Sequence, residues 1–127
     1  MRLTPHFDSR EFACHDGTPV PADELGSVRR LCQELLEPLR AQFGPVTVVS
    51  GYRTRAYNRA VGGAAQSYHV YDDRPRGAAA DIRCRRGGPG AWYAAADRLG
   101  AGGLGLYDAH VHVDTRPGRA RWREAAP

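Results

Sequence analysis

The longest hydrophobic pattern in the chain lies between residues 23 and 43. Apolar side chains recur there at steps of three and four residues, which is the period of a helix with one face on a core. They are Leu25, Val28, Leu31, Cys32, Leu35, Leu36, Leu39 and Phe43. Gly44 and Pro45 follow, a pair typical of a helix end. We therefore predict a long helix over 23–43, with the Cys32 thiol in the core.

Shorter patterns predict the remaining elements. A β-branched run at 46–49 predicts a strand, and Thr54 can cap a second helix that ends near Val61. The other expected elements are one helical turn at 8–12, a strand at 78–83, a helix at 89–99, a glycine-rich turn at 100–105, and paired strands at 106–107 and 110–114. Helices that precede and interleave with strands favour an α+β fold, a small antiparallel sheet with flanking helices.

Length and composition limit the class of protein. The chain has 127 residues, 42% of them hydrophobic and 25% charged, which is typical of one globular domain spanning 1–127. No apolar run approaches the roughly 20 residues that cross a bilayer, so we expect no membrane insertion. The first residues lack the apolar region of a signal peptide, and the sequence leaves the localisation open.

The net charge of +4 comes from 18 basic residues, all of them arginine. The densest groups, Arg83, Arg85 and Arg86 and then Arg116, Arg119, Arg121 and Arg123, lie among Gly and Pro rather than along one element. We interpret them as solvated surface and expect no nucleic-acid partner. The three cysteines include no C-x-x-C spacing, which argues against a thiolate zinc site, although Cys14 beside His15 is a minor metal candidate.

Two clusters of polar residues can carry chemistry. His110 and His112 alternate with valines, so on a strand they share one face with Asp114. Half-exposed polar residues on an edge strand would give the same pattern. His69 and Asp81 form the second cluster, and Asp81 follows a run of small residues. Together with His112 they match the His and carboxylate ligands of hydrolytic zinc sites, which leave a fourth position for water.

The order of the motifs along the chain resembles the M15 zinc peptidases over roughly residues 3 to 122. The matching motifs are Phe7-Asp8-Ser9-x-Glu11-Phe12, Ser50-Gly51-Tyr52-Arg53, Asn58, Gly62-Gly63-Ala64, Ser67-x-His69, Gly77-x-Ala79-x-Asp81-Ile82 and His110-Val111-His112-Val113-Asp114. This family contains D-alanyl-D-alanine carboxypeptidases and peptidoglycan endopeptidases, and it shares its fold with the hedgehog signalling domain. The resemblance implies the same fold here.

The resemblance also implies a zinc site and substrate contacts. His69, Asp81 and His112 would bind one zinc ion, and Arg53 matches the arginine that helps to hold substrate. A planar guanidinium can grip a carboxylate or a polarised carbonyl with two hydrogen bonds. The remaining expected substrate contacts are Ser67, whose hydroxyl could instead orient His69, and its neighbours Gln66 and Tyr68.

The chain departs from the family pattern between the first two ligands. Eleven residues separate His69 from Asp81, more than is usual in the family, and 70–76 forms an apparent insertion. This loop brings Asp72 and Asp73, which are alternative carboxylate ligands. The motif around Asp81 favours Asp81, and we expect the insertion to shape substrate choice.

The second departure concerns the general base. Many family members carry an acidic residue three positions before the last ligand, where this chain has Ala109. Asp108 is the nearest substitute. His110 could instead stabilise the oxyanion or move the proton, and Asp114 could orient a metal ligand.

These observations favour a zinc peptidase that hydrolyses an amide bond in peptidoglycan stem peptides, as a carboxypeptidase or an endopeptidase. The alternative is a catalytically inactive, zinc-containing module that binds the cell wall or a protein. We expect a monomer whose partner is a peptidoglycan peptide. That substrate lies outside the membrane. A phage lysin released through a membrane lesion would account for a chain without a signal peptide, and so would a catalytic domain trimmed from a longer protein.

Overall fold

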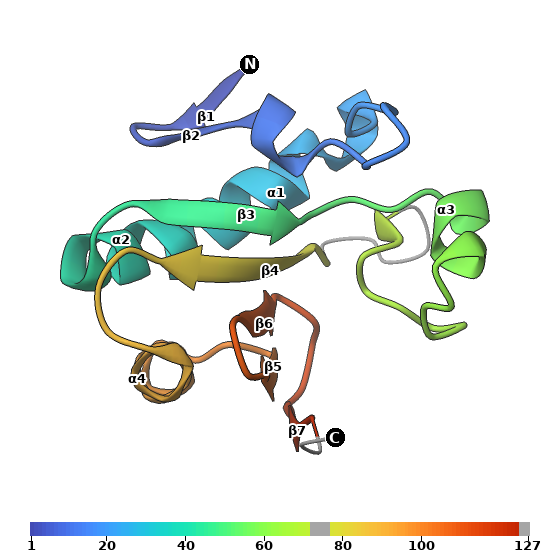
Figure 1. Ribbon diagram of the computed structural model, residues 1–127. Helices are drawn as coiled ribbons and strands as arrows, with labels where there is room; N and C mark the ends of the chain where they lie inside the picture. Colours follow the sequence, from blue (N-terminus) through green and yellow to red (C-terminus); the bar gives the residue numbers. More distant parts are fainter. Residues whose placement is uncertain (72–76, 125–127) are drawn as a thin grey trace.

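In the part of the chain that the structure describes, seven strands and four α-helices are arranged around one larger sheet (Figure 1). The computed structural model describes residues 1–71 and 77–124. The elements, with two 3-10 helices (η1, η2) and a π-helical turn (η3), are β1 (Arg2–Thr4), β2 (Phe7–Asp8), η1 (Ser9–Phe12), η2 (Ala22–Glu24), α1 (Leu25–Leu31), η3 (Cys32–Leu36), α2 (Glu37–Phe43), β3 (Val46–Ser50), α3 (Arg55–Ala60), β4 (Ala79–Cys84), α4 (Pro89–Arg98), β5 (Gly103–Leu106), β6 (Val111–Asp114) and β7 (Ala120–Arg123).

The long helix predicted over 23–43 is present as η2, α1, η3 and α2 in succession. Its predicted apolar stripe is buried apart from Leu25, and Cys32 is fully enclosed. The π-helical turn lies directly before Pro38. The Glu37 N–H donates to the Cys32 carbonyl, five residues back, and Pro38 has no N–H with which to continue an α-helical ladder. The proline therefore accounts for the local change of period.

The larger sheet has five strands in the order β3-β4-β6-β5-β7. All pairs are antiparallel except β5 and β7, which are parallel. The separate β1–β2 pair is antiparallel. These elements confirm the α+β class, but the larger sheet is mixed. Strand β7 was missed because its arginines were interpreted as solvated surface among Gly and Pro, although Ala120 and Trp122 alternate with them.

The glycine-rich turn predicted over 100–105 is wrong for its second half, which is strand β5. A side chain at Gly103 would collide with the Asp114 carboxylate, and one at Gly105 would collide with the Trp122 indole. The glycines are therefore explained by neighbours that approach the strand closely. Such neighbours cannot be read from the local sequence.

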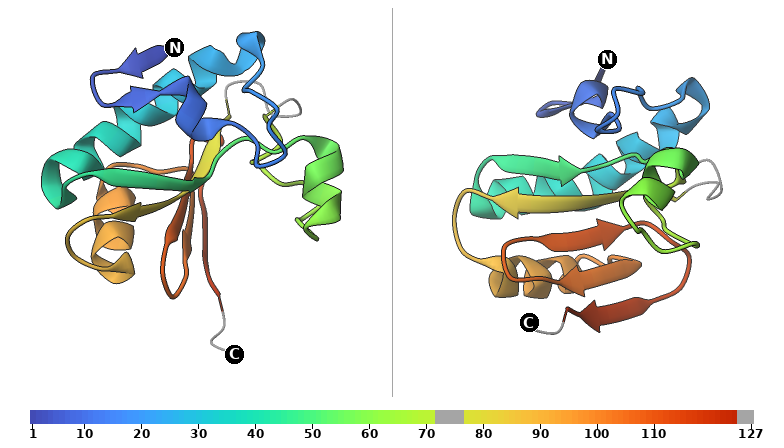
Figure 2. Two further views of the ribbon diagram at one scale, coloured as in Figure 1. Left: turned by 45° about the horizontal axis from the view of Figure 1, so that its top comes forward. Right: turned by 45° about the vertical axis from the view of Figure 1, so that its right-hand side comes forward.

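The helices cover one face of the sheet. Helices α2 and α4 pack against each other and against β3, β4, β5 and β6 (Figure 2). Ala80, Ile82, Val111 and Val113 are fully buried toward them. Because side chains alternate along a strand, Asp81 and His112 point to the opposite face. No helix in the described ranges is both long and apolar enough to span a bilayer.

Candidate metal centre

Asp81 and His112 are cross-strand neighbours on the face opposite the helices. Antiparallel pairing of β4 with β6 places them directly opposite each other. The Oδ1 atom of Asp81 lies 3.2 Å from Nδ1 of His112. The register of two strands therefore brings a carboxylate and an imidazole together although 31 positions separate them in the sequence.

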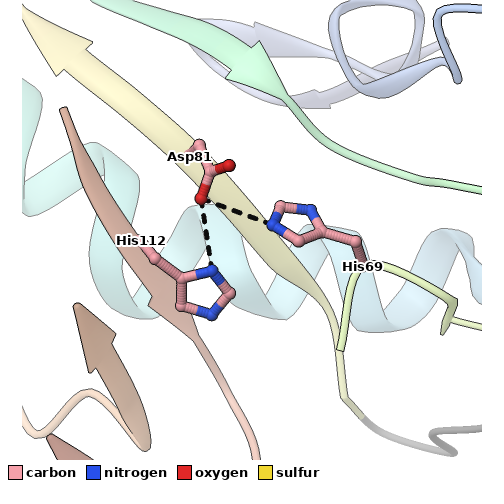
Figure 3. Close-up of side chains that lie close together, drawn as sticks. All are labelled: His69, Asp81 and His112. Atoms are coloured by element: carbon pink, nitrogen blue, oxygen red, sulfur yellow. Dashed lines mark hydrogen bonds and ion pairs between the residues drawn. The ribbon is translucent and has the colours of Figure 1, made fainter. Parts of the chain in front are cut away.

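His69 reaches the same carboxylate from the loop that follows α3. Its Nε2 atom lies 3.3 Å from Oδ1 of Asp81, so both rings point at one oxygen (Figure 3). The backbone around His69 is held by two main-chain bonds, in which the Arg53 N–H donates to the His69 carbonyl and the Val70 N–H donates to the Ser67 carbonyl. The His69 side chain is buried, with 6% of its surface exposed.

The two distances from the Asp81 oxygen to the imidazole nitrogens match those between ligands of a small tetrahedral ion. Ligand bonds of about 2.0–2.1 Å at tetrahedral angles place neighbouring donor atoms about 3.3–3.4 Å apart. The two distances to Asp81 are 3.2 and 3.3 Å, and all three ligand atoms lie within 4.8 Å of one another. In the described part of the chain, no other group of three His, Cys, Asp or Glu residues comes together in this way, and Cys14 belongs to none.

The outer nitrogen of each imidazole is engaged elsewhere. Nδ1 of His69 lies 2.7 Å from the Gly51 carbonyl, which only accepts, so this nitrogen carries the proton and Nε2 is left bare. Nε2 of His112 lies 2.7 Å from Oδ2 of Asp114. The carboxylate therefore fixes His112 with Nδ1 toward Asp81. Two inward nitrogens and a carboxylate oxygen thus converge, which is an electron-rich arrangement suited to a cation.

The protonation states of His69 and Asp81 also favour the binding of a cation. Burial lowers the pKa of His69, with Asp81 opposing the shift, so His69 is neutral at pH 7. Burial alone would raise the pKa of Asp81, but His112 and His69 hold that pKa well below its usual range. His112 differs, because Asp114 and Asp81 outweigh its burial and raise its pKa. A proton on Nδ1 of His112 competes with a metal ion for the same lone pair, so metal binding releases it.

A cleft of about 350 Å³ opens beside the three residues. It is lined by Arg53, Ala64, Gln66, Ser67, Tyr68, His69, Asp81, Tyr107, His112, Arg116 and Trp122. The sequence-predicted residues Arg53, Gln66, Ser67 and Tyr68 thus all border it. The Ser67 hydroxyl accepts a 3.2 Å hydrogen bond from the His69 N–H, which places Ser67 as a support for His69.

Arg53 enters this cleft with unused hydrogen-bonding capacity. Its Nη1 donates over 3.3 Å to the Asn58 side chain, while its Nε is buried and has no partner. The Asn58 amide is in turn held by the Ala64 carbonyl at 2.9 Å. Helix α3 and the loop after it therefore aim a guanidinium at the space beside His69, where an anionic or polarised oxygen of a ligand would satisfy it.

A family model described as Peptidase M15 matches residues 5–114. The chain belongs to the Peptidase M15 family. Peptidases of this family are metal-dependent, and the cluster of His69, Asp81 and His112 can hold the ion. No curated protein matches the chain. The matched region of this M15 peptidase includes all three residues and Arg53, but it ends before Arg116 and Trp122.

The two residues expected to handle protons lie in different places. His110 is 28% exposed, its Nε2 lies 4.0 Å from Oδ2 of Asp81, and its ring stacks on Tyr107 with centroids 4.4 Å apart. Asp108 is exposed in the β5–β6 connection and lines a separate hollow with Pro89 and Arg123. The structure therefore brings His110, but not Asp108, next to the candidate metal ligands. Asp72 and Asp73, the alternative ligands, fall outside the described residues.

Sequence reasoning missed three residues that line the M15 cleft: Tyr107, Arg116 and Trp122. The interpretation of Arg116 as solvated surface is wrong, because it binds the buried Asp114. Its signal was available, since Arg116 continues the two-residue alternation of His112 and Asp114. Trp122 carried no comparable signal, because β7 reaches the site only through its pairing with β5.

Proposed function

We propose that this M15 peptidase is a zinc enzyme that hydrolyses an amide bond in the stem peptides of bacterial peptidoglycan. The observation that carries the proposal is the convergence of two imidazole nitrogens on one carboxylate oxygen, at 3.2 and 3.3 Å, beside a cleft that an underused arginine enters. Three such ligands leave one coordination position for chemistry, as in hydrolytic rather than structural zinc sites. This arrangement of ligands is compatible with both D-alanine carboxypeptidase and endopeptidase activity.

The side chains supply binding and charge stabilisation. His69, Asp81 and His112 would hold the ion, which when bound supplies a Lewis acid and lowers the pKa of a water molecule. Arg53 would donate two hydrogen bonds to the carbonyl oxygen or to a terminal carboxylate of the peptide. Tyr68 and Gln66 would line the path of the peptide chain. A net positive protein also suits a polyanionic wall, although this charge selects no particular bond.

His110 is the better-placed group for proton transfer. Its imidazole is partly exposed, lies 4.0 Å from Oδ2 of Asp81, and can accept a proton from water and return it to the leaving amine. Asp108 lines a separate hollow. We therefore propose His110 as the general base, with Asp108 as the alternative.

One observation favours the second candidate, an inactive zinc-containing binding module. Apart from Asp81, the described lining of the cleft contains no carboxylate. A site without an effective base would still bind zinc and a wall peptide through Arg53. Such a module would recognise the peptide without cutting it.

Two measurements test the proposal. Zinc should raise the unfolding temperature of the wild-type protein, since a ligand at 100 times its dissociation constant stabilises the fold by about 2.7 kcal/mol. Purified peptidoglycan incubated with the zinc-loaded protein should release fragments whose masses identify the bond that is cut. Turnover should disappear on chelation and return with zinc.

Variants distinguish the alternatives. His110→Ala should reduce the rate roughly 100- to 10,000-fold if His110 is the base, while Asp108→Ala should have little effect. The opposite result would assign the base to Asp108. Zinc binding without turnover on any wall substrate would leave the binding module, and failure to bind zinc at all would contradict both functions.

A further inference from the structure

Residues that face the cleft side of the sheet alternate along β6, and this alternation continues past the end of the region that matches the family. His112, Asp114 and Arg116 are spaced by two, and the match ends at Asp114. Arg116 lies in the connection between β6 and β7, and Trp122 lies on β7 itself. The segment beyond the match therefore contributes directly to one wall of the cleft.

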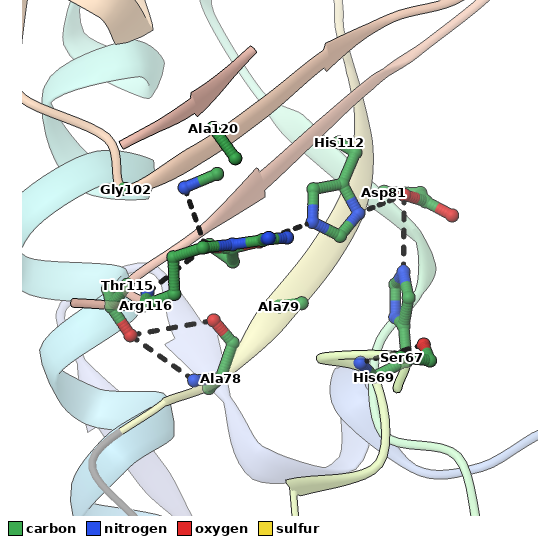
Figure 4. Close-up of polar contacts among 12 residues, drawn as sticks. Ser67, His69, Ala78, Ala79, Asp81, Gly102, His112, Thr115, Arg116 and Ala120 are labelled. Carbon is green, nitrogen blue, oxygen red and sulfur yellow. Dashed lines mark hydrogen bonds and ion pairs between the residues drawn. The ribbon is translucent and has the colours of Figure 1, made fainter. Parts of the chain in front are cut away.

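Arg116 binds Asp114 with its guanidinium and its main chain. Figure 4 shows the Arg116 side chain extending toward the His112 ring. Nη2 donates to Oδ2 at 2.7 Å, Nε lies 3.0 Å from both carboxylate oxygens, and the Arg116 N–H donates to Oδ1 at 3.0 Å. The Gly103 N–H adds a 2.7 Å bond to Oδ1. These donors, together with His112, hold a carboxylate whose side chain is 0% exposed.

The guanidinium itself is fixed between two aromatic rings. Its central carbon lies 4.0 Å from the Tyr68 ring centroid and 5.3 Å from that of Trp122. Trp122 also packs on the His112 ring with centroids 4.9 Å apart, and its indole N–H donates to the Tyr107 hydroxyl at 2.9 Å. A planar cation stacked in this way keeps its fork in one orientation.

We propose that Arg116 is a positioning residue for the metal ligand His112. Arg116 orients the plane of the Asp114 carboxylate, and Oδ2 of that carboxylate then accepts the proton on Nε2 of His112. This contact turns Nδ1 toward Asp81. The inference rests on the proposed zinc centre, and it assigns Arg116 a geometric role beyond neutralising a buried charge.

Zinc affinity of the full chain provides the test. Zn²⁺ alone is titrated into metal-free protein in competition with a chromophoric chelator. Arg116→Gln should weaken binding roughly 10- to 100-fold, the range typical of groups that orient a metal ligand. Arg116→Lys keeps the charge without the planar fork and should restore only part of the affinity.

Arg121 offers a matched control. Its side chain is 16% exposed against 21% for Arg116, and it binds Asp97 at 2.9 Å and the carbonyls of Ala101 and Gly102. None of these partners lines the cleft. Arg121→Gln should lower the free energy of unfolding and leave zinc affinity within about twofold of wild type, because the groups that its side chain binds lie outside the cleft.

The outcomes are separable. Wild-type affinity in Arg116→Gln, or an equal loss in Arg121→Gln, would overturn the positioning role. If Arg116→Gln does not fold, Arg116→Lys decides, because unchanged affinity there would exclude a need for the fork. Should the wild type bind no zinc, the proposed function fails instead. The imidazole ¹H–¹⁵N NMR spectrum then still tests the hydrogen bond from Nε2 of His112 to Asp114. A neutral His112 that carries its proton only on Nδ1 would show that this bond is absent.

Discussion

Two glycines of β5 let the sheet approach the side chains that surround the candidate metal centre. Gly103 leaves room for the Asp114 carboxylate and donates its N–H to it at 2.7 Å. Gly105 lies beneath the Trp122 indole, where any side chain would collide with the ring. The space for two residues that contact His112 therefore depends on missing side chains in a neighbouring strand.

Gly105→Ala should destabilise the protein and displace Trp122. Overpacking a tight site costs about 1–3 kcal/mol, and the indole is the group most able to move. Urea unfolding would measure the loss, and near-ultraviolet circular dichroism would report the change around the tryptophan.

Gly90→Ala in α4 is the matched control, because no atom lies within 4 Å of the added carbon. It should be neutral or stabilising by up to about 1 kcal/mol. Equal stability of Gly105→Ala and wild type would contradict the close packing of Trp122 on β5.

Helix α3 and its cap place Arg53 at the cleft. Thr54 accepts a 3.0 Å hydrogen bond from the Tyr57 N–H and donates one of 3.2 Å to the Asp16 carboxylate. The helix that follows carries Asn58, which contacts the Arg53 guanidinium. One hydroxyl thus ties the loop before α1 to the element that orients a substrate-binding candidate.

Thr54→Ala should lower the free energy of unfolding by about 1 kcal/mol, the usual cost of losing an N-cap. Thr54→Ser retains the hydroxyl and should remain within a few tenths of a kcal/mol of wild type. Chemical denaturation of both variants measures the difference. If the serine variant lost as much as the alanine variant, the methyl group and not the cap would be responsible.

At the scale of elements, the local sequence was sufficient to predict an element where a helical repeat of apolar residues or a helix cap marks it. The stripe over 23–43, the cap at Thr54 and the helix from Pro89 were all predicted within a few residues of their observed bounds. Strands β1, β2 and β7 were not, since each has at most four residues and depends on a partner strand. Strands β1 and β2, with three and two residues, carry too few side chains for a period of two to be recognised.

The two faces of the larger sheet have different roles, because one forms the hydrophobic core and the other borders the cleft. The helices and the apolar residues of β4 and β6 form the core on one face, and the polar residues between them form the cleft on the other. Cys32 belongs to this core and is 0% exposed, so unfolding transfers its thiol from the core to water. Its ionisation is therefore linked to the stability of the fold.

Stability should fall at alkaline pH because of this thiol. Burial raises the pKa of Cys32 to about 12, while the unfolded chain ionises near the ordinary thiol value of about 8.5. Between these values the unfolded state has lost the proton that the folded state retains. The free energy of unfolding then decreases by up to about 1.4 kcal/mol per pH unit from this group.

Cys32→Ala should remove that part of the slope when urea unfolding is measured from pH 8 to 10. Val28→Ala, also 0% exposed on the same helical stripe, should lower stability by a constant amount and keep the wild-type slope. Identical slopes for wild type and Cys32→Ala would show that the thiol is not responsible.

The sequence by itself determined the class of fold, the long helix, and the candidate set of His69, Asp81, His112 and Arg53. The helix could be predicted because the repeat of apolar residues lies within one segment. The candidate set could be predicted because the spaced motifs contain residue types whose chemistry is known. Only the tertiary structure decided that His110 and not Asp108 adjoins Asp81, and that Trp122 packs on His112. Such placements depend on strand register and on a parallel strand added from the end of the chain, and both are contacts between distant residues that no local pattern encodes.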